Sequence, residues 1–143
     1  MKIAQILTNK GPFLATIKAE ASVKHCVDEL KRHNIGALVV SDDGRTIAGI
    51  ISERDIVRTL ADFAGEVSNL KVREIMTTTV TTCSAEDSVE ELMSLMTQHK
   101  FRHVPVVDED GALVAVVSIG DLVKHRIEEL HAERAALISY ITT

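Results

Sequence analysis

The chain has 143 residues, with 16 basic and 21 acidic side chains and a formal net charge of −5. This acidity argues against a nucleic-acid binder, which needs a positive footprint. No apolar run approaches the roughly 20 residues that span a bilayer, and the N-terminal run is too short for a secretion signal. We therefore expect a protein that binds neither nucleic acid nor membrane. Cys26 and Cys83 match no ligand spacing, so we expect reduced thiols and a cytoplasmic location.

The first half of the chain predicts an ordered series of elements. A short extended piece at 13–17 precedes an amphipathic helix opened by Ser22 and Val23. An apolar strand at 37–41 follows, and the Asp-Asp-Gly turn at 42–44 predicts a hairpin. The returning strand at 47–52 leads directly into a second helix.

The second half repeats this order. The extended piece lies at 79–83, a helix opens at Ser88, and strands at 104–108 and 113–118 flank the Glu-Asp-Gly turn at 109–111. Each unit is therefore a β-α-β-β-α repeat, preceded by a short lead-in helix turn. The sequence predicts an α/β (α+β) fold of two repeats related by a pseudo-twofold axis, with their sheets packed together and helices outside.

The spacing of equivalent residues measures the duplication. Ser22 and Ser88 lie 66 residues apart, but Val39-Val40 and Val106-Val107 align at an offset of 67. We therefore expect one residue inserted before that strand in the second repeat and one in the first hairpin. With a linker at 64–71, the predicted domains are residues 1–66, the first repeat with its lead-in segment, and 67–143, the second with an extended C-terminal helix.

One motif occurs twice where a strand ends and a helix begins. GIISERDIV at 49–57 and AVVSIGDLV at 115–123 share a serine with an aspartate three residues later. A serine N-cap with an acidic residue at that spacing forms a capping box that needs no ligand. Aspartate is shorter than glutamate and should close the box less well, which would leave a carboxylate that can accept hydrogen bonds from outside, for example from a vicinal diol. Spacing alone leaves both interpretations open.

The tandem repeat, this motif and VPVVDEDG at 104–111 together resemble a pair of cystathionine-β-synthase-type (CBS) domains of the stand-alone bacterial kind. The resemblance covers nearly the whole chain. It implies a non-catalytic sensor that binds an adenosine nucleotide in clefts between the repeats and relays occupancy to an unknown regulated partner. AMP and NAD(H) are the leading ligands, with ATP behind, so an energy or redox sensor is expected. The competing hypothesis is a protein-interaction scaffold with vestigial clefts.

The resemblance also implies site residues. The motif aspartates would bind ribose hydroxyls, the strand entries would border the base, and basic residues would contact phosphates. The ligand-binding residues expected on this ground are Thr16, Ile35, Gly36, Ala37, Leu38, Ser52, Arg54, Asp55, Thr82, Lys100, Arg102, His103, Val104, Pro105, Ser118 and Asp121. The second repeat has Ala115 where the family pattern and the first repeat have glycine, so we expect inequivalent sites, the second slightly crowded.

The remaining features of the sequence give weaker indications of function. His99 and His103 straddle a predicted helix end, so we expect no metal site there. The sequence shows no nucleophile accompanied by a base and an orienting group, so we expect no enzymatic activity. Cys83 is a weak redox candidate because no basic residue adjoins it in sequence. The C-terminal helical segment has an apolar stripe that its own repeat cannot cover, which together with the resemblance predicts a homodimer.

Overall fold

The computed structural model describes residues 1–142 and contains two three-stranded sheets, one from each repeat. In each sheet the middle strand pairs with the first strand in parallel and with the third in antiparallel fashion. The strands are β1 (Thr16–Ile17), β2 (Ala37–Val40) and β3 (Gly49–Ser52) in the first sheet, and β4 (Cys83–Ser84), β5 (His103–Val107) and β6 (Leu113–Ser118) in the second. The predicted α/β repeat is confirmed.

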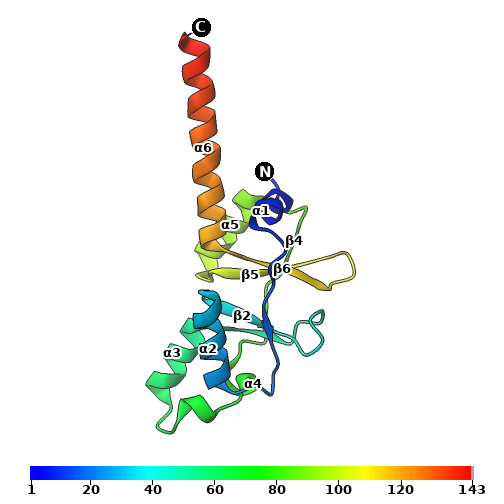
Figure 1. The fold of residues 1–143 in the computed structure, drawn as a ribbon, viewed down its shortest axis with the longest axis vertical. Coiled ribbons are helices and arrows are strands. Elements are labelled where there is room, and N and C mark those ends of the chain that lie inside the picture. Colours follow the sequence, from blue (N-terminus) through cyan, green and yellow to red (C-terminus); the bar gives the residue numbers. More distant parts are fainter. Residues whose placement is uncertain (143) are drawn as a thin grey trace.

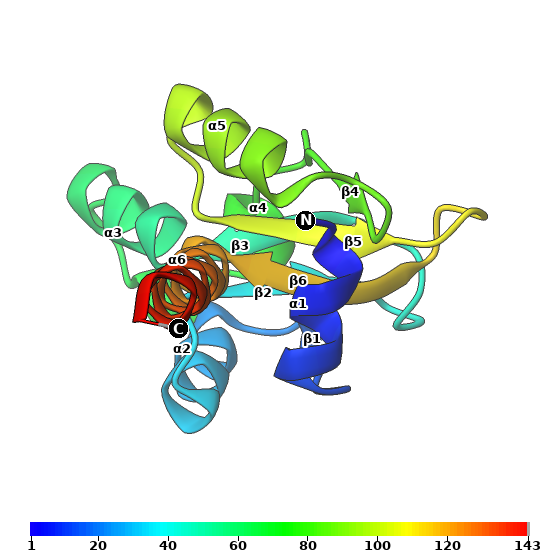
Figure 2. The same ribbon diagram turned by 90° about the horizontal axis from the view of Figure 1, so that it is seen from above.

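The helices lie around the two sheets, which face one another at the centre of the molecule (Figure 1). Seen from above, α2, α3, α5 and α6 gather toward one side, while the two hairpin turns project on the other (Figure 2). The helices are α1 (Ile3–Lys10), α2 (Val23–His33), α3 (Glu53–Asp62), α4 (Val72–Ile75), α5 (Val89–His99) and α6 (Ile119–Thr142), with a 3-10 turn at Val67–Asn69.

The strand register corrects the expected alignment of the repeats. In the first sheet Ala37 is paired with Ser52, and in the second His103 is paired with Ser118. Both partners therefore lie 66 residues further on, so the equivalent of Val39 is Pro105 and not Val106. The predicted offset of 67 in this strand was wrong because two adjacent valines in each strand can be matched in either register, and only the backbone pairing distinguishes them.

Helix ends are set by matching local chemistry in the two repeats. The Ser22 hydroxyl accepts the His25 amide at 3.0 Å at the start of α2, and Ser88 does the same for Glu91 at 3.3 Å in α5. Both helices end in a left-handed residue, Asn34 with φ 53° and Lys100 with φ 61°. Such a residue turns the chain sharply, so each middle strand starts beside the end of its helix.

The lead-in segments pack on the opposite repeats. Ile3 and Ile6 of α1 lie in the core of the second repeat with Val89, while Val67 and Val72 lie in the core of the first. The Ile3 amide donates to the Asp87 carbonyl at 2.9 Å, which fixes α1 beside α5. Each lead-in segment therefore packs on the repeat that it does not directly precede in the sequence. The domain boundary between residues 66 and 67 stays a prediction.

Helix α6 is much longer than its counterpart α3, with 24 residues against 10. Its first turns pack against α1 and α5, and the rest projects away from both repeats as a free-standing rod (Figure 1). Leu122 near its start is fully buried, whereas Leu137 and Ile141 are exposed. Among residues 1–142 no helix is both long and apolar enough to cross a membrane.

Candidate functional site

Both repeated motifs form closed capping boxes. The Ser52 amide donates to Asp55 Oδ2 at 2.9 Å, and the Asp55 amide donates to Ser52 Oγ at 3.3 Å. The same pair of bonds joins Ser118 and Asp121, at 2.9 and 3.1 Å. The expectation that aspartate, being shorter than glutamate, would close the box less well was wrong at both motifs. Each box uses Oδ2 of its aspartate, so the availability of Oδ1 decides whether the carboxylate can also hold a ligand.

A cavity of about 310 Å³ lies beside Asp121, between the two repeats. We call it the Asp121 cleft. Its volume is at the lower end of the range for small-molecule sites. Six of the residues expected at a ligand site line it together: Ile35, Gly36, Ala37, His103, Ser118 and Asp121. The other lining residues are Lys10, Phe13, Leu14, Ala15, Asn34 and Val116.

An ion pair that the sequence did not indicate lies in the Asp121 cleft. Lys10 Nζ donates to Asp121 Oδ2 at 2.7 Å and to the Val116 carbonyl oxygen, also at 2.7 Å. Burial is the largest single influence on Asp121 and would raise its pKa, but the bonds from Lys10 and Ser118 together lower it. The carboxylate is therefore ionised at neutral pH. Its Oδ1 accepts no hydrogen bond from the residues that the structure describes.

His103 and Gly36 meet at the centre of the molecule, one from each repeat. A Cβ atom on Gly36 would lie 3.1 Å from Cε1 of the His103 ring and 3.3 Å from Glu53 Oε1. The absence of a side chain at Gly36 therefore makes room for the imidazole. Burial lowers the pKa of His103, so the ring is neutral at neutral pH. It can offer a hydrogen bond to a ligand, but it does not supply the positive charge expected of it for phosphate.

The equivalent carboxylate, Asp55, is engaged on both oxygens. Its Oδ2 accepts the Ser52 amide and the Ser52 hydroxyl, and its Oδ1 accepts the Thr77 hydroxyl at 3.1 Å. Thr77 is itself held in place, because its backbone exchanges two hydrogen bonds of 2.9 Å with Ile50. We call these residues the Asp55 site. Its carboxylate is already satisfied inside the protein.

The backbone at Gly49 explains the glycine that distinguishes the repeats. A Cβ atom on Gly49 would lie 2.7 Å from the Thr77 carbonyl oxygen and 2.9 Å from Met76 Sδ. Contacts below 3.0 Å require the neighbours to move, and a backbone oxygen cannot move cheaply. Ala115 is tolerated at the equivalent strand position because there Lys10 reaches Val116 through its side chain instead of through backbone pairing. Gly49 therefore makes room for the contact of Met76 and Thr77 with β3; it does not widen a ligand cleft.

The remaining expected residues lie elsewhere. The side chains of Leu38 and Val104 are fully buried in the two cores, and Pro105 is buried beside them. Thr16 is half-buried in β1. Lys100 and Arg102 are exposed, and Arg54 Nη1 donates to the Lys100 carbonyl at 2.7 Å. Ligand contacts by these residues stay a prediction.

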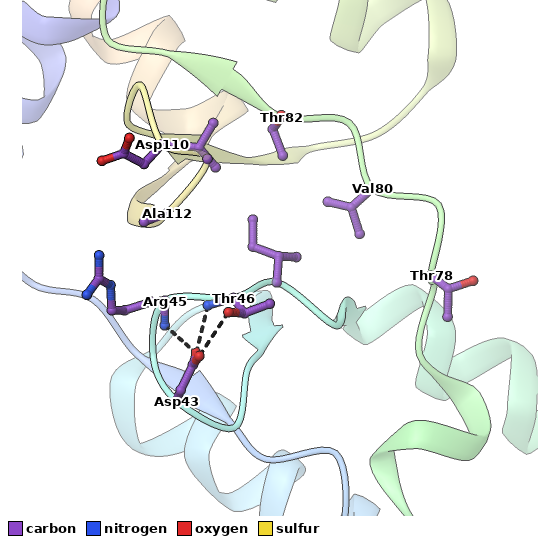
Figure 3. Close-up of a pocket in the computed structure, with 11 residues that line it drawn as sticks. Asp43, Arg45, Thr46, Thr78, Val80, Thr82, Asp110 and Ala112 are labelled. Atoms are coloured by element: carbon purple, nitrogen blue, oxygen red, sulfur yellow. Dashed lines mark hydrogen bonds between the residues drawn. The ribbon is translucent and has the colours of Figure 1, made fainter.

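Thr82 lines a second, wider hollow of about 680 Å³ between the hairpins (Figure 3). Asp43 on its rim accepts the amides of Arg45 and Thr46 at 2.8 and 2.7 Å and the Thr46 hydroxyl at 2.8 Å. These bonds hold the pKa of Asp43 well below its usual range. Asp43 therefore fixes the first hairpin turn, and the Arg45 carbonyl accepts the Leu113 amide at 2.8 Å to join the repeats.

The cysteines and histidines form no reactive or metal centre in the part of the chain that the structure describes. No group of three potential metal ligands comes together within residues 1–142. Cys26 and Cys83 are buried and unpaired as thiols, and burial raises their pKa to about 11 and about 12. A thiol that stays protonated is a poor nucleophile, so the structure argues against the redox candidacy of Cys83.

Comparison with known proteins identifies the family. The model for the CBS domain matches residues 5–62 and 72–128, and the chain therefore belongs to the CBS-domain family. The CBS domain-containing protein YhcV of Bacillus subtilis is 32% identical over 123 residues, which cover 85% of each chain. The crystal structure of the CBS-domain protein ATU1752 from Agrobacterium tumefaciens superposes with a TM-score of 0.83 at 37% identity, over 88% of this chain and 99% of that one.

A further solved relative contains ligands. The CBS domain pair of protein MJ0100, crystallised in complex with 5-methylthioadenosine and S-adenosyl-L-methionine, superposes with a TM-score of 0.78 at 25% identity. The match covers 90% of this chain and 98% of that one. Both ligands of MJ0100 share an adenosine moiety.

Proposed function

We propose that the protein is a non-catalytic sensor that binds an adenosine nucleotide in the Asp121 cleft. The observation that carries this proposal is the ionised Asp121 carboxylate at the cavity, with Oδ1 unused by the described residues. A vicinal diol can donate to such an oxygen, and hydrogen bonds to a charged group are stronger than neutral ones. The adenosine ligands of MJ0100 support the same class of ligand.

The rest of the cleft suits the other parts of a nucleoside. Ile35, Ala37 and Val116 supply aliphatic walls for a flat base, and the neutral His103 supplies a hydrogen-bonding group. AMP is the first candidate ligand, followed by NAD(H) and ATP. Because the cleft lies between the repeats, a ligand that prefers one arrangement of the repeats would shift the population toward it, and a partner protein could read that shift.

The first experiment identifies what the protein carries and binds. Freshly purified protein is denatured, released small molecules are identified by mass spectrometry, and the stripped protein is titrated with AMP, NAD, NADH, ATP and 5-methylthioadenosine by calorimetry. We expect saturable binding of at least one adenosine ligand in the micromolar range, near −8 kcal/mol. Absence of binding by every ligand to folded protein would contradict the sensor proposal.

A matched pair of variants locates the site. Asp121→Ala should weaken nucleotide binding about tenfold or more, because the ribose loses its charged acceptor. Asp55→Ala removes an equivalent capping box and should cost a similar amount of stability, about 1 kcal/mol, with little effect on binding. Equal losses of affinity in the two variants would show that the asymmetry between the carboxylates does not govern binding.

The Asp55 site favours a second candidate function. Its carboxylate is satisfied by Ser52 and Thr77, so this half of the molecule has the character of a vestigial cleft within an interaction scaffold. A scaffold would bind a partner protein with no dependence on nucleotide. If no ligand binds in any titration while the far-ultraviolet circular dichroism spectrum shows that the protein is folded, the scaffold would be the better description.

We also propose that two copies associate through the projecting part of α6. Ile127, Leu130, Arg134, Leu137 and Ile141 follow one another at alternating spacings of three and four residues, which is the repeat of a two-stranded coiled coil. Ile127 and Leu130 are 48% and 45% exposed, and Leu137 and Ile141 are 62% and 78% exposed. Isoleucine occupies the first position of the seven-residue repeat at 127 and 141, and leucine occupies the fourth at 130 and 137, which is the arrangement that favours parallel dimers; Arg134 interrupts it at one first position. Arg134 would then face the acidic Glu133 of the partner subunit.

Light scattering over a concentration series tests this association. Leu137→Glu should convert the dimer to a monomer, since it places a charge in the contact, while its distance from both repeats leaves their fold intact. Ala132→Glu adds the same charge on the opposite face of α6 and should remain dimeric. A monomer mass for the unsubstituted protein at every concentration would refute the association.

A further inference from the structure

Lys10 is the feature of the Asp121 cleft that the motifs do not explain. It is the last residue of α1, the lead-in helix that packs on the second repeat. Its ammonium bonds Asp121 Oδ2 and the Val116 carbonyl, and its side chain is 29% exposed, so it lines the cavity while remaining partly open to solvent. An ammonium has three donors, and these two bonds leave one N–H for a ligand.

The charges around the cavity single out Lys10. Among the described residues that line it, Lys10 and Asp121 are the two charged side chains at neutral pH, because burial keeps His103 neutral. The charges of Glu53 and Asp121 raise the pKa of the His103 ring and those of Lys10 and Arg102 lower it, but burial is the largest influence and the net shift is downward. Arg54, expected to contact phosphate, does not line this cavity, and its Nη1 donates to the Lys100 carbonyl. The positive charge within the cleft therefore comes from Lys10.

We propose that Lys10 makes the Asp121 cleft selective for adenosine ligands that carry a phosphate over uncharged or cationic ones. This inference rests on the proposed function of the cleft. A phosphate close to the ammonium gains a charge-assisted hydrogen bond, while the ribose diol uses the open Oδ1 of Asp121. A ligand without a phosphate makes the diol contact alone. The preference is therefore carried by a residue of the lead-in helix and not by the repeated motif.

The duplicated structure supplies a natural comparison at this position. Met76 lies 66 residues after Lys10 and follows α4 directly, as Lys10 closes α1. Its sulfur packs toward Gly49, and the adjacent Thr77 reaches Asp55. The Asp55 site thus has a neutral residue where the Asp121 cleft has a cation. Lys10→Met copies this arrangement into the cleft with an aliphatic stem of similar length.

The experiment compares AMP with adenosine, which differ by the phosphate alone. Both are titrated by calorimetry into the unsubstituted protein, Lys10→Met, Lys10→Arg and the control Lys24→Met, which removes an exposed lysine paired with Asp28. We expect Lys10→Met to weaken AMP binding about tenfold or more, with adenosine unchanged or tighter. Lys10→Arg should keep the preference for AMP, Lys24→Met should match the unsubstituted protein, and added salt should reduce the preference.

Other outcomes overturn the inference in distinguishable ways. Equal weakening of both ligands by Lys10→Met would assign Lys10 a purely positioning role. Tighter binding of both would make it a competitor of the ligand for Asp121. If the unsubstituted protein binds AMP and adenosine equally well, selectivity by Lys10 is refuted while the adenosine site stands. If it binds no adenosine ligand at all, the proposed function fails, and this inference fails with it.

Discussion

The Asp55 site and the Asp121 cleft have the same motif and different chemistry. Each has a serine and an aspartate closing a capping box at a strand-to-helix junction. Thr77 then satisfies the second oxygen of Asp55, whereas Oδ1 of Asp121 accepts no bond among the described residues, and Lys10 pairs with its Oδ2. The motif therefore fixes where a carboxylate sits, while the lead-in segment that passes over it decides what the carboxylate can do.

The lengths of the two lead-in helices account for this difference. α1 has 8 residues and α4 has 4, so the first lead-in is one turn longer. The shorter segment brings its backbone against β3, where Thr77 pairs with Ile50. The longer one ends with Lys10, whose side chain reaches the Val116 carbonyl. Duplicated repeats can thus diverge in function through their connections while their motifs stay the same.

The largest stability effect is expected from Gly49→Ala. The added methyl group would meet the Thr77 carbonyl oxygen at 2.7 Å and force the lead-in segment away from β3. We expect a loss of about 1–3 kcal/mol in the free energy of unfolding, measured by urea denaturation. Ala115→Gly, the reciprocal change, should cost no more than about 1 kcal/mol, because it removes one methyl group from a strand. Equal losses would mean that the two lead-in contacts are equivalent.

A smaller effect is expected from Thr77→Val, which removes the hydroxyl that donates to Asp55 Oδ1 at 3.1 Å. The two side chains have nearly the same shape, so the variant isolates the hydrogen bond. We expect a loss of about 0.5–1.5 kcal/mol in thermal or urea unfolding and no change in nucleotide affinity at the Asp121 cleft. Thr78→Val, at the neighbouring exposed threonine, is the control. Weaker nucleotide binding in Thr77→Val alone would assign a ligand to the Asp55 site.

The smallest effect concerns acid stability. The pKa of Asp121 is lower in the folded protein than its ordinary value of 3.8, with Lys10 among the causes. The resulting stabilisation is present above the unfolded value and is lost as the pH falls through the folded value. Lys10→Met removes the ion pair, so the variant should lose less stability than the unsubstituted protein between about pH 5 and pH 2. Parallel stability curves for the two proteins over this interval would contradict the assignment.

Much of the architecture followed from local sequence patterns. Alternating apolar residues, Asp-Gly turns and serine caps predicted the order of elements in both repeats, because each of these signals acts within a few residues. The same locality explains the misplaced register of the middle strands. Val39-Val40 and Val106-Val107 look equivalent as letters, but hydrogen bonding to the neighbouring strands pairs Val39 with Ile50 and Pro105 with Val116.

The sequence by itself determined the duplication, the helix caps and the two motif aspartates, since short-range periodicity and capping need no knowledge of distant contacts. Tertiary structure alone decided that α1 crosses to the second repeat, and this crossing places Lys10 beside Asp121 across 111 positions of chain. It also decided that Thr77 satisfies Asp55. Both contacts join side chains from separate segments, and their geometry depends on how the two cores bury their lead-in helices.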